Sequence, residues 1–115
     1  MILPSNSDAG RLILGSILLS DERYPEIASV LEQNDFSLEK HRRIFARMKD
    51  LFDRGERIDR LTLANELQNR RQMQAVDGVS YLVLLDEGLP EIVNLDGYVR
   101  IVKDKSLLRQ TMFTC

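Results

Sequence analysis

Few residues in this sequence have side chains suited to catalysis or metal binding. His41 is the only histidine and Cys115 the only cysteine, so a metal site at His41 would need carboxylates as its other ligands, and no zinc-finger spacing exists. No serine lies in a Gly-x-Ser-x-Gly turn, and no histidine stands at a spacing that suggests a partner base. The sequence therefore predicts no catalytic residue and no metal site.

The remaining polar motifs favour structural roles. His41 opens the segment His-Arg-Arg-Ile-Phe at residues 41–45, where a hydrogen bond at the edge of the core is the expected role. The Asp-Glu pairs at residues 21–22 and 86–87 fall at helix boundaries, where solvated charges are common. No glycine is followed by lysine, so the phosphate-binding loop of an ATPase is absent and no cofactor is predicted for this chain.

Length and composition indicate one soluble domain. The chain has 115 residues, of which 43% are hydrophobic and 30% charged, the usual range for a single globular core. Its apolar stretches, such as residues 12–14 and 17–19, are too short to cross a bilayer, and residues 1–7 do not resemble a signal peptide. A single cysteine fits a reducing compartment, so we expect a cytoplasmic protein without a membrane partner.

The net charge of −2 conceals a segregation of charge along the chain. Residues 1–39 hold two basic and seven acidic side chains, and residues 40–71 hold ten basic and five acidic ones. Residues 72–95 hold four acidic side chains and no basic one, and residues 96–115 four basic and two acidic ones. Two interpretations are open: surfaces that meet other proteins, or neighbouring helices that attract one another.

The spacing of apolar residues predicts an all-α fold, a compact bundle of about six helices. They are expected at residues 8–19, from residue 25 to residue 33 or 34, between Ser37 and Gly55, at 60–71, around 81–85, and from residue 95 towards the end. No run of residues alternates between apolar and polar for long enough to predict a β-strand. Val30 and Phe52 are expected in the apolar stripes of their helices, and Glu66 in water.

Side chains at the expected helix ends predict their caps. Ser7 or Asp8, Ser37, Asp59 and Asn94 are good N-cap residues, and Gly55 suits a left-handed C-terminal position. With Asp59 as the cap, Ile58 and Leu63 have the spacing of a hydrophobic staple. Gly88 and Pro90 are expected to stop the short helix before them.

The order of these motifs resembles the N-terminal domain of DnaB-type bacterial replicative DNA helicases, and the resemblance covers nearly the whole chain. The matching segments are residues 13–19, 35–36, 41–45, 54–59 with 62–63, 77–82, 94, and 98–105 with 108–109. Three positions depart from the family pattern. Gly10 follows Ala9 where the family usually has glutamate, Arg57 stands where proline is common, and Gly78 follows Asp77 where the family usually has a second glycine.

The resemblance implies a helical head that does not itself unwind DNA. Residues 1–94 would form the head, and residues 95–115 the first arm of an extended helical hairpin. Heads of this family form dimers within a hexameric ring and dock the helicase-binding domain of primase, and in some cases a loader protein. This fragment would not be an enzyme, since ATP and Mg²⁺ would belong to the motor of an ATP-dependent helicase, in the cytoplasm and associated with the nucleoid.

The resemblance also suggests residues for two contacts. Asp8 and Tyr81 are candidate primase-binding residues, although Tyr81 could instead only pack the core. Val99, Ile101, Val102, Leu108 and Met112 spread apolar surface widely around the last helix, which predicts self-association into a homodimer. The alternative for this helix is fraying beyond Leu108.

The competing functional hypothesis is a helix-turn-helix DNA-binding domain. Its basic face would comprise the arginines of the third and fourth helices, namely Arg54, Arg57, Arg60, Arg70 and Arg71. Asp53, Glu56 and Asp59 are interleaved with these arginines. A recognition helix should be polar and basic, whereas the expected fifth helix is acidic and apolar. We therefore expect no sequence-specific DNA binding.

Overall fold

The computed structural model describes residues 6–87, 89 and 94–113, and the side chains of all of these except Asn6 and residues 111–113. Every regular element in these ranges is helical, which confirms the predicted all-α class. The α-helices are α1 (Asn6–Leu19), α2 (Tyr24–Ala28), α3 (Glu39–Asp53), α4 (Arg60–Asn69), α5 (Gly78–Asp86) and α6 (Leu95–Phe113). Three single turns of 3-10 helix connect them: η1 (Asp21–Arg23), η2 (Gln33–Asp35) and η3 (Gln74–Val76).

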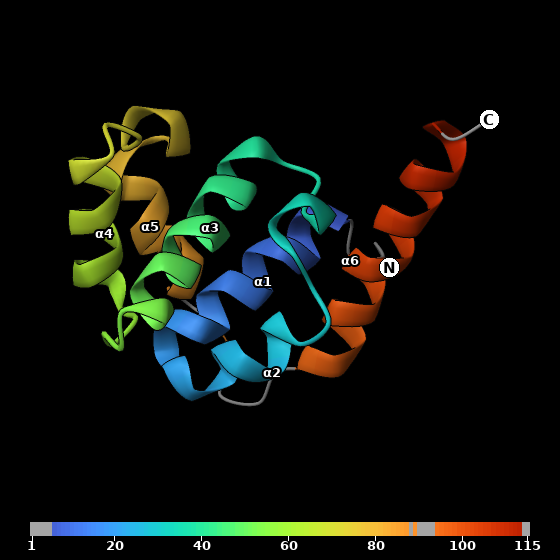
Figure 1. Cartoon of the computed structure of the whole chain (residues 1–115), viewed down its shortest axis with the longest axis horizontal. Helices are drawn as coiled ribbons and strands as arrows, with labels where there is room; N and C mark the ends of the chain where they lie inside the picture. Colours follow the sequence, from blue (N-terminus) through green and yellow to red (C-terminus); the bar gives the residue numbers. More distant parts are fainter. Residues whose placement is uncertain (1–5, 88, 90–93, 114–115) are drawn as a thin grey trace.

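Helix α1 is the centre of the arrangement. It contacts α3, α5 and α6, and Figure 1 shows it crossing the middle of the molecule, with α4 and α5 at one end and α6 at the other. Ile13, Leu14 and Ile17 are fully buried. A helix surrounded in this way must be apolar on more than one face. The consecutive apolar residues of α1 meet that requirement.

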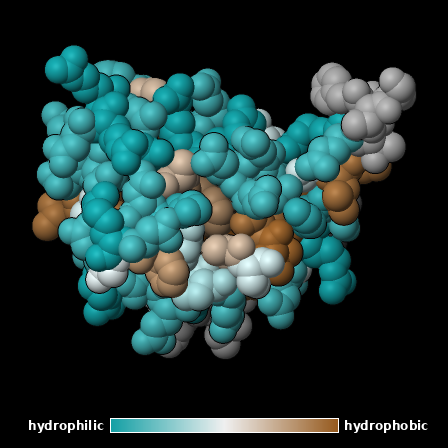
Figure 2. Space-filling model, viewed as in Figure 1, coloured by the Kyte–Doolittle hydropathy of each residue, from teal (hydrophilic) through white to brown (hydrophobic). Residues whose placement is uncertain are grey.

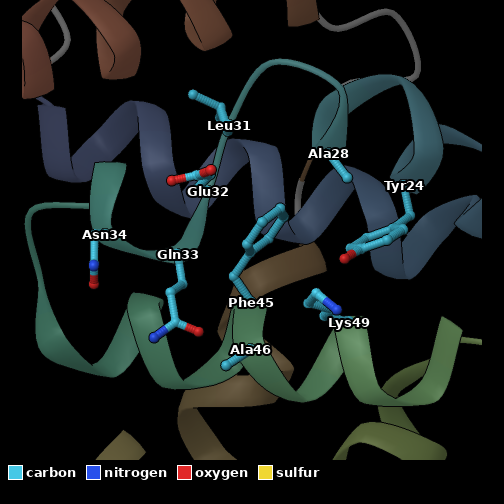
Figure 3. A pocket seen from close by; sticks show the side chains of 9 residues that line it. All are labelled: Tyr24, Ala28, Leu31, Glu32, Gln33, Asn34, Phe45, Ala46 and Lys49. Atoms are coloured by element: carbon cyan, nitrogen blue, oxygen red, sulfur yellow. The ribbon is translucent and has the colours of Figure 1, made fainter. Parts of the chain in front are cut away.

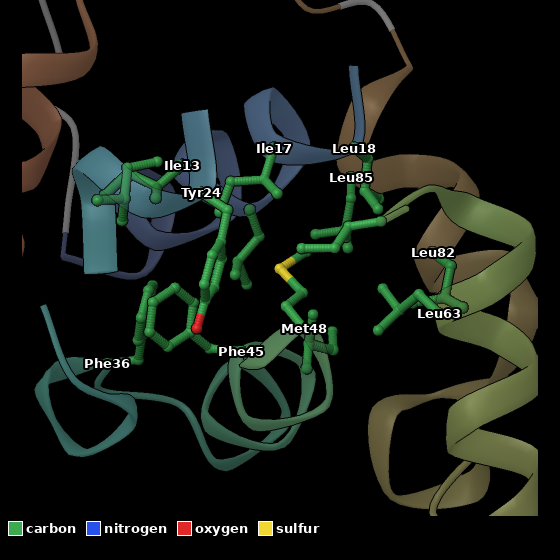
Figure 4. Packing of buried hydrophobic residues seen from close by; sticks show 14 of the residues in the cluster. Ile13, Ile17, Leu18, Tyr24, Phe36, Phe45, Met48, Leu63, Leu82 and Leu85 are labelled. Atoms are coloured by element: carbon green, nitrogen blue, oxygen red, sulfur yellow. The ribbon is translucent and has the colours of Figure 1, made fainter. Parts of the chain in front are cut away.

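The core is continuous from α1 to both ends of the molecule (Figure 4). Tyr24, Phe36 and Phe45 pack with their rings 5.0–5.5 Å apart, as the Tyr24–Phe45 and Phe36–Phe45 pairs. Met48 fills the space towards Leu63, which lies on α4. On the far side of α1, Val102 brings α6 into the same core and is fully buried.

Gly15 lets α1 and α5 come close together. A Cβ atom added at Gly15 would lie 1.9 Å from the carbonyl oxygen of Leu85 and 2.7 Å from its carbonyl carbon. No side chain fits at that distance, and the obstacle is backbone, which cannot rotate away. The glycine that interrupts the first apolar stretch is therefore a packing requirement.

The predicted caps were confirmed at two helices. At α4, the Thr62 amide donates to Asp59 Oδ1 (2.8 Å) and the Asp59 amide donates to Thr62 Oγ1 (2.9 Å). Ile58 and Leu63, the two residues of the predicted staple, are both buried. At α6, the Gly97 amide donates to Asn94 Oδ1 at 3.2 Å. Gly55 has φ +76, the expected left-handed conformation.

Other predicted boundaries were wrong. Helix α1 begins at Asn6, so Ser7 and Asp8 lie in its first turn, and α3 begins at Glu39 after Leu38 rather than after Ser37. Helix α2 ends at Ala28, because Glu32 is extended and starts η2 as a separate capped turn. The α4 helix ends at Asn69. Gly88 and Pro90 lie outside the described residues.

Three predicted positions also differ in burial. Val30 and Phe52 were expected in the apolar stripes of their helices but expose 47% and 45% of their surface. Val30 follows the end of α2, so it has left the helical stripe, while the Phe52 ring lies 5.0 Å from the Tyr24 ring at the edge of the core. Glu66, expected in water, is 6% exposed. It is buried because Arg54 bonds it at 2.7 Å.

A buried carboxylate connects α6 to η2. Asp35 is 3% exposed and accepts hydrogen bonds from the Glu32 amide (2.7 Å) and Ser106 Oγ (2.6 Å), while Lys103 Nζ lies 3.2 Å away. Burial acts to raise the pKa of Asp35, but these donors outweigh it and hold the pKa below its ordinary value. One helical turn further on, Arg109 donates to the carbonyls of Asn34 and Asp35. These contacts hold α6 beyond its last core residue.

We predict that Gly15→Ala destabilises the protein by about 2 kcal/mol or more, although alanine favours helix by about 1 kcal/mol. The reason is that Cβ would force α1 away from the Leu85 carbonyl. Urea unfolding measures the change. Gly10→Ala in the same helix is the control, since its Cβ would meet only side chains, at 3.0 Å and 3.2 Å. Equal stability of the Gly15 variant and the parent would contradict the packing argument.

Candidate protein-docking surface

Tyr81 and His41 meet where α5 packs near the start of α3. The Tyr81 hydroxyl oxygen lies 2.6 Å from His41 Nε2, and the two rings are stacked with centroids 5.9 Å apart. His41 is 1% exposed and Tyr81 is half-buried. The histidine therefore fixes a tyrosine that still reaches the surface.

Lys40 covers the Tyr81 ring on the solvent side. Its Nζ lies 3.8 Å from the ring centroid, a cation–π distance, and 3.0 Å from Asp77 Oδ2. Asp77 has φ +67 and stands immediately before α5. Lys40, Asp77 and Tyr81 thus form an amphipathic surface at the junction of α3 and α5.

Burial controls the charge of His41. Desolvation, with smaller effects from the Lys40 and Arg11 charges, lowers the pKa of His41 from 6.5 to about 4. The imidazole is therefore neutral at pH 7. Its Nδ1 is buried without a hydrogen-bond partner and faces Gly10, where an added Cβ would lie 3.0 Å away. The predicted role of His41, a hydrogen bond at the edge of the core, is confirmed.

The two predicted primase-binding residues, Tyr81 and Asp8, differ in burial. Tyr81 packs against the core while keeping part of its surface exposed, so the core alternative is correct in part and the interface role stays a prediction. Asp8 is exposed in the first turn of α1. Arg11, three residues further along, donates to the Leu84 carbonyl of α5 at 3.1 Å. Sequence reasoning missed Lys40 and Arg11, because only the folded chain brings them to Tyr81.

The predicted self-association residues are corrected by the packing of α6 on α1. Val102 is fully buried, so it cannot contact a second copy in this conformation. Val99 and Ile101 are half-buried against the core. Leu108 is 58% exposed and Leu107, which the sequence did not single out, is 48% exposed. The side chain of Met112 lies outside the described residues.

Four of the five arginines of the alternative DNA-binding face are engaged in ion pairs. Arg57 bonds Asp21 at 2.7 Å and Arg60 bonds Asp86. Arg54 pairs with Glu56 and Glu66, and Arg70 with Asp50 and Glu66. These carboxylates neutralise the charges that phosphates would need. The pairs between elements support the interpretation that oppositely charged neighbouring segments attract one another.

In the described part of the chain, no group of three or more His, Cys, Asp or Glu side chains is placed to hold a metal ion. No helix in those ranges is both long enough and apolar enough to span a membrane.

The described chain thus combines an all-helical fold with a tyrosine on α5 that is held by a histidine of α3. Residues 2–104 match the family model of the DnaB-like helicase N terminal domain, and the chain belongs to this family. It is 35% identical over 111 residues to the replicative DNA helicase DnaC of Bacillus subtilis, covering 96% of this chain and 24% of that protein. It is 34% identical over 113 residues to DnaB of Geobacillus stearothermophilus, covering 98% and 25%. The chain thus spans about a quarter of the length of these relatives.

Solved structures show the same fold. The N-terminal domain of DnaB helicase from Mycobacterium tuberculosis superimposes with a TM-score of 0.87 at 32% identity, covering 95% of this chain and 78% of that one. The corresponding Helicobacter pylori domain, whose structure was described with its interactions with primase, gives a TM-score of 0.79 at 23% identity and covers 93% and 83%. The helix-turn-helix alternative is not favoured by these comparisons.

The lowered pKa of His41 predicts a loss of stability at mildly acidic pH. The unfolded chain binds a proton at His41 near pH 6.5 and the folded chain only near pH 4, so stability is full above pH 6.5 and falls towards pH 4. We expect a loss of about 2–3 kcal/mol between pH 7 and pH 4.5 from this residue. Urea unfolding across this range measures it. His41→Gln should flatten the dependence, and an unchanged slope in that variant would contradict the assignment.

Proposed function

We propose that this chain is the protein-interaction head of a hexameric replicative DNA helicase and that it docks the helicase-binding domain of primase. The observation that carries the proposal is the Tyr81 side chain, which lies 2.6 Å from His41 and is only partly buried. Rigid aromatic side chains with a polar tip are frequent anchors at protein interfaces. The primase interactions described for the Helicobacter pylori domain support the same assignment.

The rest of the proposed role follows from the relatives. Relatives about four times as long are replicative DNA helicases, so we assign ATP and Mg²⁺ binding, and unwinding itself, to a motor outside this head. The head would act in the cytoplasm at the nucleoid and support assembly of the ring. A helicase loader is a further proposed partner. Asp8 is proposed as a second primase-binding residue in addition to Tyr81.

The primase assignment predicts that Tyr81→Ala weakens binding of the helicase-binding domain at least tenfold, because an anchor side chain is lost. Isothermal titration at a temperature where all variants are folded measures the affinity. Leu82→Ala is the matched control, since Leu82 is fully buried one residue away in α5. It should lose stability and keep the parent affinity. Primase binding that is unchanged in Tyr81→Ala, or that falls equally in the control, contradicts the interface role.

The outer face of α6 is assigned to self-association. Leu107 and Leu108 expose apolar surface on α6, whose C-terminal end extends away from the other helices in Figure 1. Covering such surface contributes about 25 cal/mol for each square ångström removed from water. A homodimer formed by two symmetry-related copies of this face would cover both leucines in both chains.

We predict that Leu108→Glu shifts the protein towards monomer, since a carboxylate would have to be buried at the contact. Sedimentation velocity at several protein concentrations measures the distribution. Leu61→Glu is the control, because Leu61 is 81% exposed on α4 and takes no part in the proposed contact. A parent protein that stays monomeric at high concentration would remove the case for a dimer through α6.

A further inference from the structure

Two recesses adjoin one another along the outer face of α3. The first, of about 340 Å³, lies between α3 and the segment containing α2 and η2 (Figure 3). The second, of about 240 Å³, lies beside it towards the start of α3. Both are lined by Gln33, Asn34 and Ala46, so they form one continuous groove that passes over Ala46. None of the lining residues belongs to the Tyr81 surface.

One half of the groove is apolar. Tyr24, Ala28, Leu31 and Phe45 line it, with Glu32 and Lys49 as the charged residues of its lining. Figure 3 shows the Phe45 ring projecting between α3 and the chain that follows α2. Apolar surface also gathers near the middle of the face shown in Figure 2, over α2 and the chain that follows it. The volume is at the lower end of those found for ligand pockets. It suits an apolar side chain rather than a large cofactor.

The other half of the groove is cationic. Arg42, Arg43 and Arg47 line it with a single acidic side chain, Glu39. Arg42 donates to the backbone carbonyls of Phe36 and Ser37, which hold its guanidinium in place without neutralising it. Arg43 donates from its terminal nitrogen to Glu39 at 2.7 Å. The recess therefore retains a net positive charge in its lining.

Two donors in the cationic half lack acceptors. The Nε atoms of Arg43 and Arg47 are enclosed by protein and have no hydrogen-bond partner, although Arg47 forms an ion pair with Asp50 at 3.4 Å. The Arg43 side chain is still 35% exposed. Guanidinium groups bind carboxylates through paired, parallel hydrogen bonds, so a carboxylate in the recess would bind through the exposed part of these arginines.

We propose that this groove is a second docking site, for a short acidic peptide segment in which an aromatic or leucine side chain stands next to one or two carboxylates. The apolar side chain enters the recess at Phe45 and the carboxylates face Arg43 and Arg47. A second copy of this chain fits less well. The exposed leucines of α6 stand between the basic residues Lys105 and Arg109, which the arginines of the groove would repel. A nucleic acid would meet the arginines but has no side chain for the apolar half. This site is independent of the proposed primase surface.

The test uses a short fluorescein-labelled peptide with two glutamates followed by leucine and phenylalanine, titrated by fluorescence anisotropy. One comparison peptide has both glutamates replaced by glutamine, and another has leucine and phenylalanine replaced by serine. We expect each comparison peptide to bind at least tenfold more weakly than the first. Equal affinities, or no saturable binding of the first peptide, overturn the proposal.

Variants of the chain locate the binding. Ala46→Glu places bulk and negative charge where the recesses join and should weaken binding at least tenfold. The double variant Arg43→Gln with Arg47→Gln leaves the apolar half intact and should also weaken binding at least tenfold. It replaces Ala46→Glu in the test if that variant does not fold. Arg100→Glu is the control, because Arg100 is exposed on α6 and the charge change is twice that of Ala46→Glu and equal to that of the double variant. Its affinity should stay within twofold of the parent.

Three results in these experiments would overturn the assignment to an acidic peptide. Binding that falls equally in Arg100→Glu would show a general charge effect. Displacement of the peptide by inorganic phosphate or a single-stranded oligonucleotide at matched concentration would show a plain anion site. A change in sedimentation of Ala46→Glu without peptide would show that the groove is a contact between copies. Primase binding by Ala46→Glu should be unchanged, which separates this site from the proposed function.

Discussion

The close approach of α1 to the Leu85 carbonyl sets the geometry of the whole domain. Because the Cβ position of residue 15 is occupied by backbone of α5, only glycine allows the central helix to lie where it does. The position of α5 in turn brings Tyr81 over His41 of α3. On another side of α1, the same helix receives α6 through Val102. A wider separation of α1 and α5 would therefore disturb the Tyr81 surface and the position of α6 as well as the core.

The sequence predicted what depends on neighbouring residues and missed what depends on tertiary contacts. The caps at Asp59 and Asn94 follow from hydrogen bonds within three residues, which local patterns contain. Val102 was predicted to take part in self-association because the periodicity of apolar residues does not say how much of a helix its neighbours cover. Glu66 was assigned to water because its partner Arg54 is distant in the sequence. Tyr81 and His41 could each be singled out, but their contact with one another, and that of Tyr81 with Lys40, could not.

Electrostatic pairing explains how a nearly neutral chain with segregated charge folds into one unit. Arg57 with Asp21, Arg60 with Asp86 and Lys40 with Asp77 each join a basic segment to an acidic one. Exposed pairs of this kind typically contribute less than about 1 kcal/mol each. Their main effect is on which elements adjoin. The second recess along α3 differs, since three arginines line it with one acidic side chain, Glu39, while Asp50 outside the lining pairs with Arg47.

The Asp35 contacts also affect what binding at α6 would cost. Lys103 and Ser106 bond the Asp35 carboxylate, and Arg109 bonds the backbone beside it, so successive turns of the helix are held before any partner arrives. A helix that must become ordered during association loses conformational entropy at that step. Here folding of the domain has already imposed that order. A surface that docks on Leu107 and Leu108 therefore meets a preorganised helix, and more of the free energy of burial remains available as affinity.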